Sequence, residues 1–182
     1  MNKEKILAER KELMERLADE LQDNLIAAMI KENETEEEEE DPVILSVLLD
    51  ELGSGREEAF MECCFTPLTS EEDAVQFFTS VITLSDDLDR DYLPALIESV
   101  SYINFQIPCG SFHVDKTHSF LCFRLAAPLP IGQTGDALYE EINILTGNAV
   151  AVTDQYFDLL LDVSRGKATL EDVLEVLGGV DA

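Results

Sequence analysis

The chain has 182 residues, and its 39 acidic against 12 basic side chains give a formal net charge of −27 at pH 7. A surface of this sign repels phosphates, so we expect no nucleic-acid partner; a basic protein, a basic segment or a divalent cation would suit it better. No apolar run approaches the roughly 20 residues of a membrane span, and residues 1–12 lack the apolar stretch of a signal peptide. We therefore expect a cytoplasmic protein without a membrane partner.

Leucines spaced four apart predict that the N-terminal segment, residues 1–33, is a long amphipathic helix whose pattern runs from residue 3 to residue 31. They are Leu13, Leu17, Leu21 and Leu25. Residues 34–42 include five consecutive glutamates, whose mutual repulsion indicates a solvated acidic linker. Residues 43–182 are then expected to form one α+β domain, so that the chain is a single globular domain overall.

Three segments have the composition of β-strands, namely residues 43–52, 59–66 and 75–84. The sequence Gly53-Ser54-Gly55 permits a reversal between the first two, which predicts a hairpin and, with the third strand, an antiparallel meander. The segment from Tyr92 to Phe105 is predicted to be helical, with Asp89 or Asp91 as its N-cap.

A second hairpin is predicted from residues 111–114 and 118–126, and Pro128 and Pro130 are expected to stop its second strand. Residues 136–163 return to helical spacing, and Gly147 marks a point where this helix can kink or split. Thr169, followed three residues later by Asp172, matches a capping box and predicts a short terminal helix through Leu177.

The order helix, three strands, helix, two strands, helix, helix predicts the α+β class, with a twisted antiparallel five-stranded sheet and helices packed on it. Several strands are apolar on both faces, as in the first strand, where Leu45 and Val47 alternate with Ile44 and Leu48. A sheet wetted on one side should alternate more cleanly, so we expect a helix or another chain to cover part of the second face. On this ground we predict a homodimer.

The stretch from Asn104 to Asp115 contains Gly110-Ser111-Phe112, and an apolar strand that ends in Arg124 and Leu125 follows it. This pattern, together with the order of elements over about residues 5–163, resembles the bacterial YbjN-like proteins, which share the type III secretion chaperone-like fold. The resemblance implies a small, acidic, dimeric and non-enzymatic protein. It would act by binding another protein or peptide, as a chaperone, adaptor or regulator.

We expect the partner contacts to be apolar, because burial of apolar surface contributes about 25 cal/mol per Å². The helix after the third strand would self-associate, and the second face of the sheet would contact a partner. The residues expected to make these contacts are Tyr92, Leu96, Val100 and Ile103 on the helix and Phe120 and Cys122 on the sheet. No catalytic residue and no cofactor is predicted.

A competing hypothesis is a metal-dependent sensor or enzyme centred on Cys109, His113, Asp115 and His118. Thiolate, imidazole and carboxylate all bind zinc, and a cysteine beside a histidine can act as a nucleophile. We favour ordinary strand and turn roles, because no paired metal-ligand spacing is present and acidic surroundings raise the pKa of a thiol. The adjacent pair Cys63-Cys64 points to opposite faces of a strand, which favours packing over redox chemistry.

Overall fold

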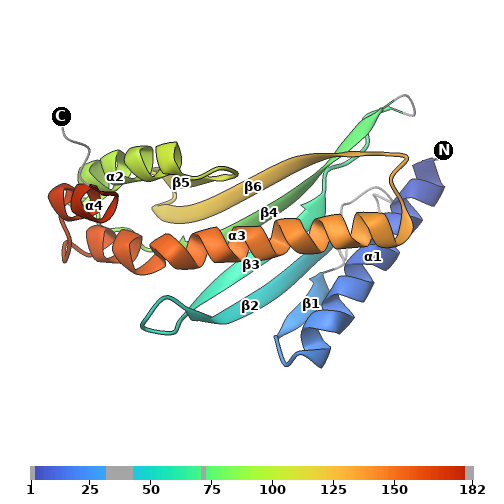
Figure 1. The fold of residues 1–182 in the computed structure, drawn as a ribbon, viewed down its shortest axis with the longest axis horizontal. Coiled ribbons are helices and arrows are strands. Elements are labelled where there is room, and N and C mark those ends of the chain that lie inside the picture. Colours follow the sequence, from blue (N-terminus) through green and yellow to red (C-terminus); the bar gives the residue numbers. More distant parts are fainter. Residues whose placement is uncertain (1–2, 32–42, 71–72, 179–182) are drawn as a thin grey trace. The chain divides into compact units, whose positions relative to one another are not determined.

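The structure is a computed structural model that describes residues 3–31, 43–70 and 73–178 (Figure 1). In these residues four helices and six strands form an α+β fold with an open antiparallel sheet of strand order β1-β2-β3-β4-β6-β5. The helices are α1 (Lys3–Asp23), α2 (Leu93–Gln106), α3 (Gly135–Ser164) and α4 (Leu170–Val176). The strands are β1 (Ala28–Lys31), β2 (Ile44–Leu52), β3 (Glu57–Phe65), β4 (Val75–Ser85), β5 (Ser111–Asp115) and β6 (Phe120–Pro130).

Backbone contacts divide the chain into two compact units. The first unit comprises residues 1–49, 60–81 and 125–148, and the second comprises residues 50–59, 82–124 and 149–182. Three strands of the meander, β6 and α3 each contribute residues to both units. α3 is continuous through Gly147, where the sequence allowed a kink or a break. The predicted acidic linker, residues 34–42, lies outside the described residues.

The N-terminal helix is shorter than the sequence predicts, and the difference adds a sixth strand to the sheet. Leu25 adopts a left-handed conformation with φ of 64°. The N–H groups of Leu25 and Ile26 donate to the carbonyls of Gln22 and Leu21, each at 2.9 Å, which is the Schellman arrangement that ends a helix. Residues 28–31 then form β1, which pairs with β2. The predictions of a helix to residue 31 and of five strands are wrong, because a leucine occupies the position where glycine usually signals the helix end.

β6 continues through Pro128, where the sequence predicted a stop. β5 pairs with β6 only as far as Arg124, so β6 has an open side beyond that residue. The N–H of Ile131 donates toward β4, to Ala74 O at 3.1 Å. Because strand residues alternate in direction, the missing N–H of Pro128 faces the open side, where no ladder bond is lost.

The predictions of helix caps have different outcomes. The capping box of α4 is confirmed, since the Asp172 N–H donates to Thr169 Oγ1 at 3.3 Å and the Thr169 N–H donates to Asp172 Oδ2 at 2.7 Å. The N-cap of α2 is Tyr92, without a side-chain cap. Asp89 instead accepts the N–H of Asp91 at 3.0 Å, so the cap prediction for α2 is wrong. Among the described helices, none is both long enough and apolar enough to cross a membrane.

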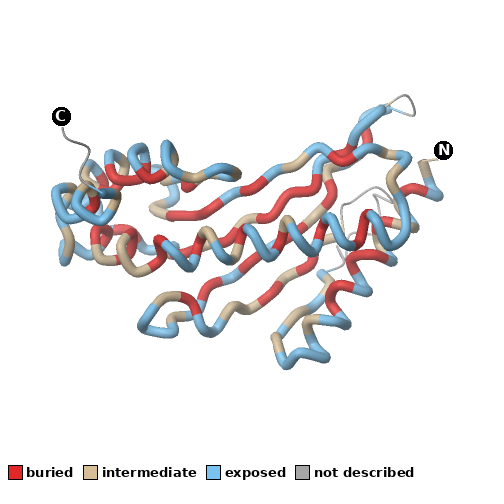
Figure 2. The backbone as a smooth tube through the Cα atoms, viewed as in Figure 1, coloured by how far each residue is buried: buried red, intermediate tan, exposed pale blue. Residues whose placement is uncertain are grey.

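The core of the first unit lies on one face of its strands. Buried and exposed residues alternate along β3, as Figure 2 shows for the strands in general. The inward side chains meet apolar residues of α1 and α3, and α1 also contacts β1. The largest fully buried members are Met14, Leu17, Leu45, Met61 and Phe78. One face of this unit's sheet therefore supplies the core.

Arg10 of α1 is a charged side chain inside this core, with an exposed fraction of 3%. Its Nη1 donates to Gln133 O at 3.1 Å, its Nη2 to Ile131 O at 3.4 Å and its Nε to Gln76 Oε1 at 3.4 Å. The guanidinium carbon lies 5.3 Å from the centre of the Phe65 ring. Burial lowers the pKa of Arg10. Arg10 thus ties α1 to β4 and to the loop that follows β6.

A second arginine of α1 joins an aromatic ring and a carboxylate of α3. The Arg16 guanidinium carbon lies 3.8 Å from the centre of the Tyr139 ring, and its Nη1 lies 2.8 Å from Asp136 Oδ1. The Tyr139 hydroxyl donates to Glu20 of α1. Burial and this hydrogen bond raise the pKa of Tyr139 to about 12. Cation, ring and carboxylate form one cluster that fastens α1 to α3.

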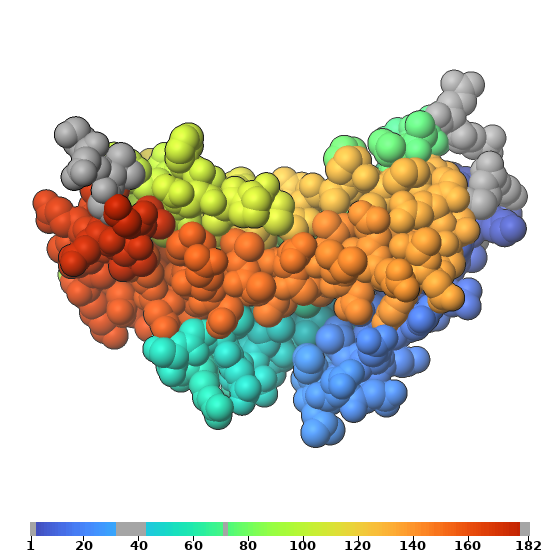
Figure 3. All heavy atoms as spheres, viewed as in Figure 1, coloured from blue at the N-terminus to red at the C-terminus, as the bar shows by residue number. Residues whose placement is uncertain are grey.

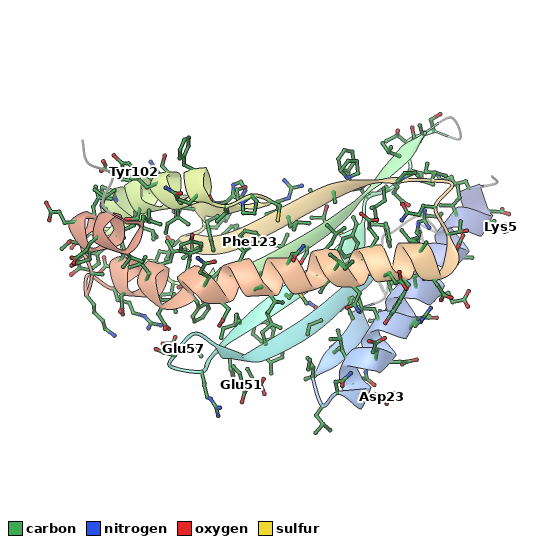
Figure 4. All side chains as sticks on the ribbon, in the orientation of Figure 1. Lys5, Asp23, Glu51, Glu57, Tyr102 and Phe123 are labelled. Atoms are coloured by element: carbon green, nitrogen blue, oxygen red, sulfur yellow. The ribbon has the colours of Figure 1, made fainter. Side chains whose placement is uncertain are left out.

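The core of the second unit surrounds the β5–β6 hairpin, where Phe112 faces Phe123 with ring centres 5.0 Å apart. Tyr156 of α3 packs against Phe112 at 6.1 Å. Gly110 precedes β5 with φ of 72°, and its backbone lies directly against the Phe123 ring. Phe123 is labelled in Figure 4. The buried side of α2 packs on this hairpin, and α2 also contacts α4.

Both edge strands have backbone groups capped by a side-chain amide. On β5, Asn104 Nδ2 donates to Phe112 O at 3.0 Å and the Phe112 N–H donates to Asn104 Oδ1 at 2.7 Å. On β1, Gln22 Nε2 donates to Ala28 O at 2.7 Å. Unpaired edge groups are a template for another strand, so these amides make addition of a strand at either edge less favourable.

Candidate binding surface

The first unit presents an apolar surface on the side of its sheet opposite the core. We name it the exposed sheet face and define it by the side chains that alternate with the buried ones. They are Met29 of β1, Ile44 and Leu48 of β2, Phe60 and Cys64 of β3, and Val75, Phe77 and Val81 of β4. The exposed fractions are 60% for Phe60, 59% for Met29 and 44% for both Val75 and Phe77. Large exposed apolar patches of this kind mark interaction sites.

The exposed sheet face carries little net charge in a chain that is 28% charged. Within the described part of the first unit, the strands place two charged side chains on this side, Lys31 and Glu62. These neutralise each other, with Lys31 Nζ 2.6 Å from Glu62 Oε1, and Ser46 Oγ also donates to Glu62 at 3.4 Å. A partner can therefore cover this surface without burying an unpaired charge.

Sequence reasoning missed the most exposed members of this face. It found that strands were apolar on both sides, but the alternation does not say which side is inward. Phe77 and Phe78 are adjacent and equally apolar, and the structure buries Phe78 completely while it exposes Phe77. Phe60 alternates with the buried Ala59 and Met61, which was the one signal in the sequence that could have identified it.

Most of the predicted contact residues of α2 are buried in the second unit. Leu96, Val100 and Ile103 are buried, because this stripe of α2 packs on its own unit, and Tyr92 is partly exposed. A buried side chain offers no surface to a second copy. Self-association through this stripe would need α2 to leave its place.

The predicted contact residues of the sheet are also partly covered. In β6, Phe120 is half-buried and Cys122 is buried. Phe120 therefore keeps some surface available to a partner, while Cys122 keeps almost none.

The residues of the competing hypothesis form two separate pairs in the second unit. His118 Nδ1 lies 2.8 Å from Asp115 Oδ2, and Ser111 Oγ lies 2.7 Å from His113 Nε2. His113 is opposite Cys122 in the hairpin, and Cys109 precedes β5. Among the described residues, no group of three or more histidine, cysteine, aspartate or glutamate side chains could hold a metal ion. The two described pairs both lie in the β5–β6 hairpin and its turn.

The buried thiols have environments that oppose nucleophilic chemistry. Burial raises the pKa of Cys63 to about 11, and burial also raises the pKa of Cys122. A thiol with a raised pKa has a smaller thiolate fraction at neutral pH, which lowers its reactivity. Cys63 and Cys122 are therefore packing residues, in agreement with the role that the sequence favours for Cys63.

Asp115 stabilises the hairpin turn, which gives a testable pH dependence. Its carboxylate accepts the N–H groups of Thr117 at 2.7 Å and His118 at 3.1 Å. The His118 ring and these two N–H groups lower the pKa of Asp115 to about 2, from roughly 3.9 in an unfolded chain. A lowered pKa stabilises the fold above the unfolded value, and the contribution is lost as the pH falls from about 4 to 2.

We therefore expect amide hydrogen exchange at Thr117 and His118 to accelerate between pH 4 and pH 2, after correction for intrinsic rates. The variant Asp115→Ala should exchange faster at pH 5 and show no further acceleration across this window. Equal protection of the two amides in both proteins at pH 5 would contradict the assignment.

A polar cavity of about 190 Å³ in the second unit serves the β2–β3 hairpin. Arg165 donates to both carboxylate oxygens of Glu57, at 3.0 and 2.9 Å, and Asp158 accepts the N–H of Ser54 at 2.7 Å. Asp154 accepts the N–H of Gly53 at 2.8 Å. Glu57 is labelled at the hairpin in Figure 4. These charged groups are thus paired with the turn or with each other.

No protein-family model matches the chain, and no curated protein sequence matches it.

Proposed function

We propose that this protein is a non-catalytic protein-binding protein, acting as a chaperone, adaptor or regulator, which holds an apolar and net basic segment of another polypeptide on the exposed sheet face. The observation that carries the proposal is the exposure of Phe60, Met29, Val75 and Phe77 on one side of the first unit. Aromatic side chains and methionine are enriched at the centres of protein interfaces. The resemblance to YbjN-like and secretion chaperone-like proteins supports the same class of function.

The energetics favour this surface as a source of affinity. Burial of a phenylalanine, valine or methionine side chain contributes about 1.5–3 kcal/mol when the side chain starts fully exposed, and proportionally less here. The Lys31–Glu62 ion pair adds no net charge to the face. The net charge of −27 favours approach of a basic partner and disfavours acidic ones.

The capped edges favour binding across the face over addition of a strand. Asn104 occupies the free backbone groups of Phe112 on β5, and Gln22 occupies the carbonyl of Ala28 on β1. A partner strand at either edge would have to displace an amide that already makes these bonds. Side-chain contacts with the exposed sheet face need no such displacement.

The test compares the double variant Phe60→Ser/Phe77→Ser with Ile144→Ser, a control that removes a 64% exposed apolar side chain of α3. The probe is a fluorescein-labelled peptide of alternating leucine and lysine, titrated with each protein. We expect fluorescence anisotropy to show at least about a tenfold rise in Kd for the double variant, since two aromatic contacts are lost. The control should bind as the unchanged protein does.

Two outcomes would contradict this assignment of the surface. Equal Kd values for the double variant and the control would show that the exposed sheet face does not hold the peptide. Sedimentation velocity that shows a dimer in the unchanged protein and a monomer in Phe60→Ser/Phe77→Ser would show that a second copy occupies the face, as the prediction of a homodimer requires.

A further inference from the structure

α2 presents a second surface, which lies opposite its buried stripe. Glu98, Tyr102 and Phe105 are spaced four and three residues apart, which places them on one side of the helix. Tyr102 is 42% exposed and Phe105 is 89% exposed. We name these three residues the α2 stripe, and Tyr102 is labelled on it in Figure 4. Within the described residues, none of these three side chains makes a hydrogen bond, ion pair or ring contact.

The two helices α2 and α4 carry acidic side chains and no lysine or arginine. α4 contacts α2, and the red α4 lies beside the yellow-green α2 in Figure 3. Together the two helices carry four carboxylates: Glu98, Glu171, Asp172 and Glu175. The last turn of α2 has no basic residue, so the partial negative charge of its C-terminus is uncompensated. Phe105 lies in this last turn.

In the first unit, an aromatic ring and a carboxylate on one side of a helix bind an arginine side chain. There, Tyr139 and Asp136 of α3 share Arg16, whose guanidinium carbon lies 3.8 Å from the ring centre and whose Nη1 lies 2.8 Å from the carboxylate. The α2 stripe has the same two kinds of group, aromatic rings and a carboxylate on one side of a helix. The α2 stripe has no arginine of its own helix beside these groups.

We propose that the α2 stripe binds an arginine- or lysine-bearing segment of a partner polypeptide, whose cation lies over Tyr102 or Phe105 and beside Glu98. Charge complementarity decides between a basic partner and a second copy, because two copies of this stripe would bring carboxylates and helix C-termini of the same sign together. Arginine fits best, since its planar guanidinium both stacks on a ring and donates to a carboxylate. This proposal rests on the proposed function for its class of partner and assigns that partner a second contact.

The experiment uses the full chain and a fluorescein-labelled 12-residue peptide of alternating arginine and serine, which has no apolar side chain to bind the exposed sheet face. The same peptide with glutamine in place of arginine is the probe control. At 150 mM salt, we expect Tyr102→Ala/Phe105→Ala to raise the Kd of the arginine peptide about fivefold or more, although the charge of the protein is unchanged. Glu98→Gln should raise it about twofold. The exposure-matched variant Ile144→Ala should have no effect.

The outcomes separate this proposal from the proposed function. If Phe60→Ser/Phe77→Ser binds the arginine peptide normally and loses only the leucine–lysine peptide, the two surfaces are independent, as we infer. If Tyr102→Ala/Phe105→Ala binds the arginine peptide like the unchanged protein, or if the glutamine peptide binds equally well, the proposal is wrong. A dimer that dissociates in Phe105→Ala would also overturn it, because a second copy would then occupy the stripe.

Discussion

Replacement of Gly110 by alanine is expected to destabilise the protein by about 3 kcal/mol. Gly110 has φ of 72°, a conformation that costs an L-residue about 1–2 kcal/mol. A Cβ there would also overlap Cζ of Phe123, which is fully buried, and would lie 3.0 Å from Arg124 O. The Phe123 ring cannot move away freely, because it packs on Phe112 with ring centres 5.0 Å apart. Urea unfolding followed by circular dichroism measures the loss.

Gly132→Ala is the matched control for this prediction. A Cβ at Gly132 would have no atom within 4 Å, and its backbone is not left-handed. We expect its free energy of unfolding to stay within about 0.5 kcal/mol of the unchanged protein. Similar stabilities of the two glycine variants would contradict the prediction, because the Phe123 ring would then accommodate the added Cβ at little cost.

Arg10→Met is expected to lower the free energy of unfolding by about 3 kcal/mol, the second large effect. Methionine keeps the volume of the side-chain stem and removes the guanidinium. The Oε1 of Gln76, which is buried, and the partly buried carbonyls of Ile131 and Gln133 would then lose their donor. Each such loss costs about 1–3 kcal/mol when no water can enter. Differential scanning calorimetry and urea unfolding measure the change.

Lys11→Met is the control for Arg10, because it removes a positive charge from the adjacent residue of the same helix. The Lys11 ammonium lies 3.9 Å from Glu15 Oε1, and both side chains are about half exposed. An exposed ion pair of this kind contributes at most about 0.5 kcal/mol. If Lys11→Met cost as much as Arg10→Met, net charge rather than the buried hydrogen bonds would explain the effect.

The sequence motif that resembled a known family has a structural explanation in this chain. Asn104 caps the backbone of Phe112, Phe112 packs on Phe123, and Gly110 admits that ring at close range. Each member holds the β5–β6 hairpin against α2. The sequence shows this pattern because glycine is favoured at a left-handed position and asparagine can bond to backbone groups. These residues stabilise the hairpin and do not identify a partner.

Local rules predicted the parts of the fold that depend on local chemistry. The hairpin at Gly53-Ser54-Gly55 and the capping box at Thr169 need only their own neighbours, and both are present. The end of α1 at Leu25 and the passage of β6 through Pro128 were missed. Leu25 makes a glycine-like turn without glycine, and Pro128 is tolerated only because β5 is short.

The candidate surfaces could be predicted only in part, since periodicity does not say what covers an apolar face. In α2, Leu96, Val100 and Ile103 were expected to meet a second copy, but they meet their own unit. The sequence did not single out Tyr102 on the other side of this helix, where it is 42% exposed. The exposure of Phe60 and Phe77 likewise depends on tertiary packing, which no local rule reports.

The amides of Gln22 and Asn104 have a consequence for how safely this molecule can display apolar side chains. Cross-β aggregation begins when unpaired backbone groups of an edge strand bond to another chain. Packing of apolar sheet faces then stabilises the stacked chains. In this protein the exposed sheet face is apolar, but side-chain amides occupy the backbone groups of the edge strands at Ala28 and Phe112. Two copies that touch through their apolar faces therefore find no free backbone group at Ala28 O or Phe112, where strand pairing would otherwise begin.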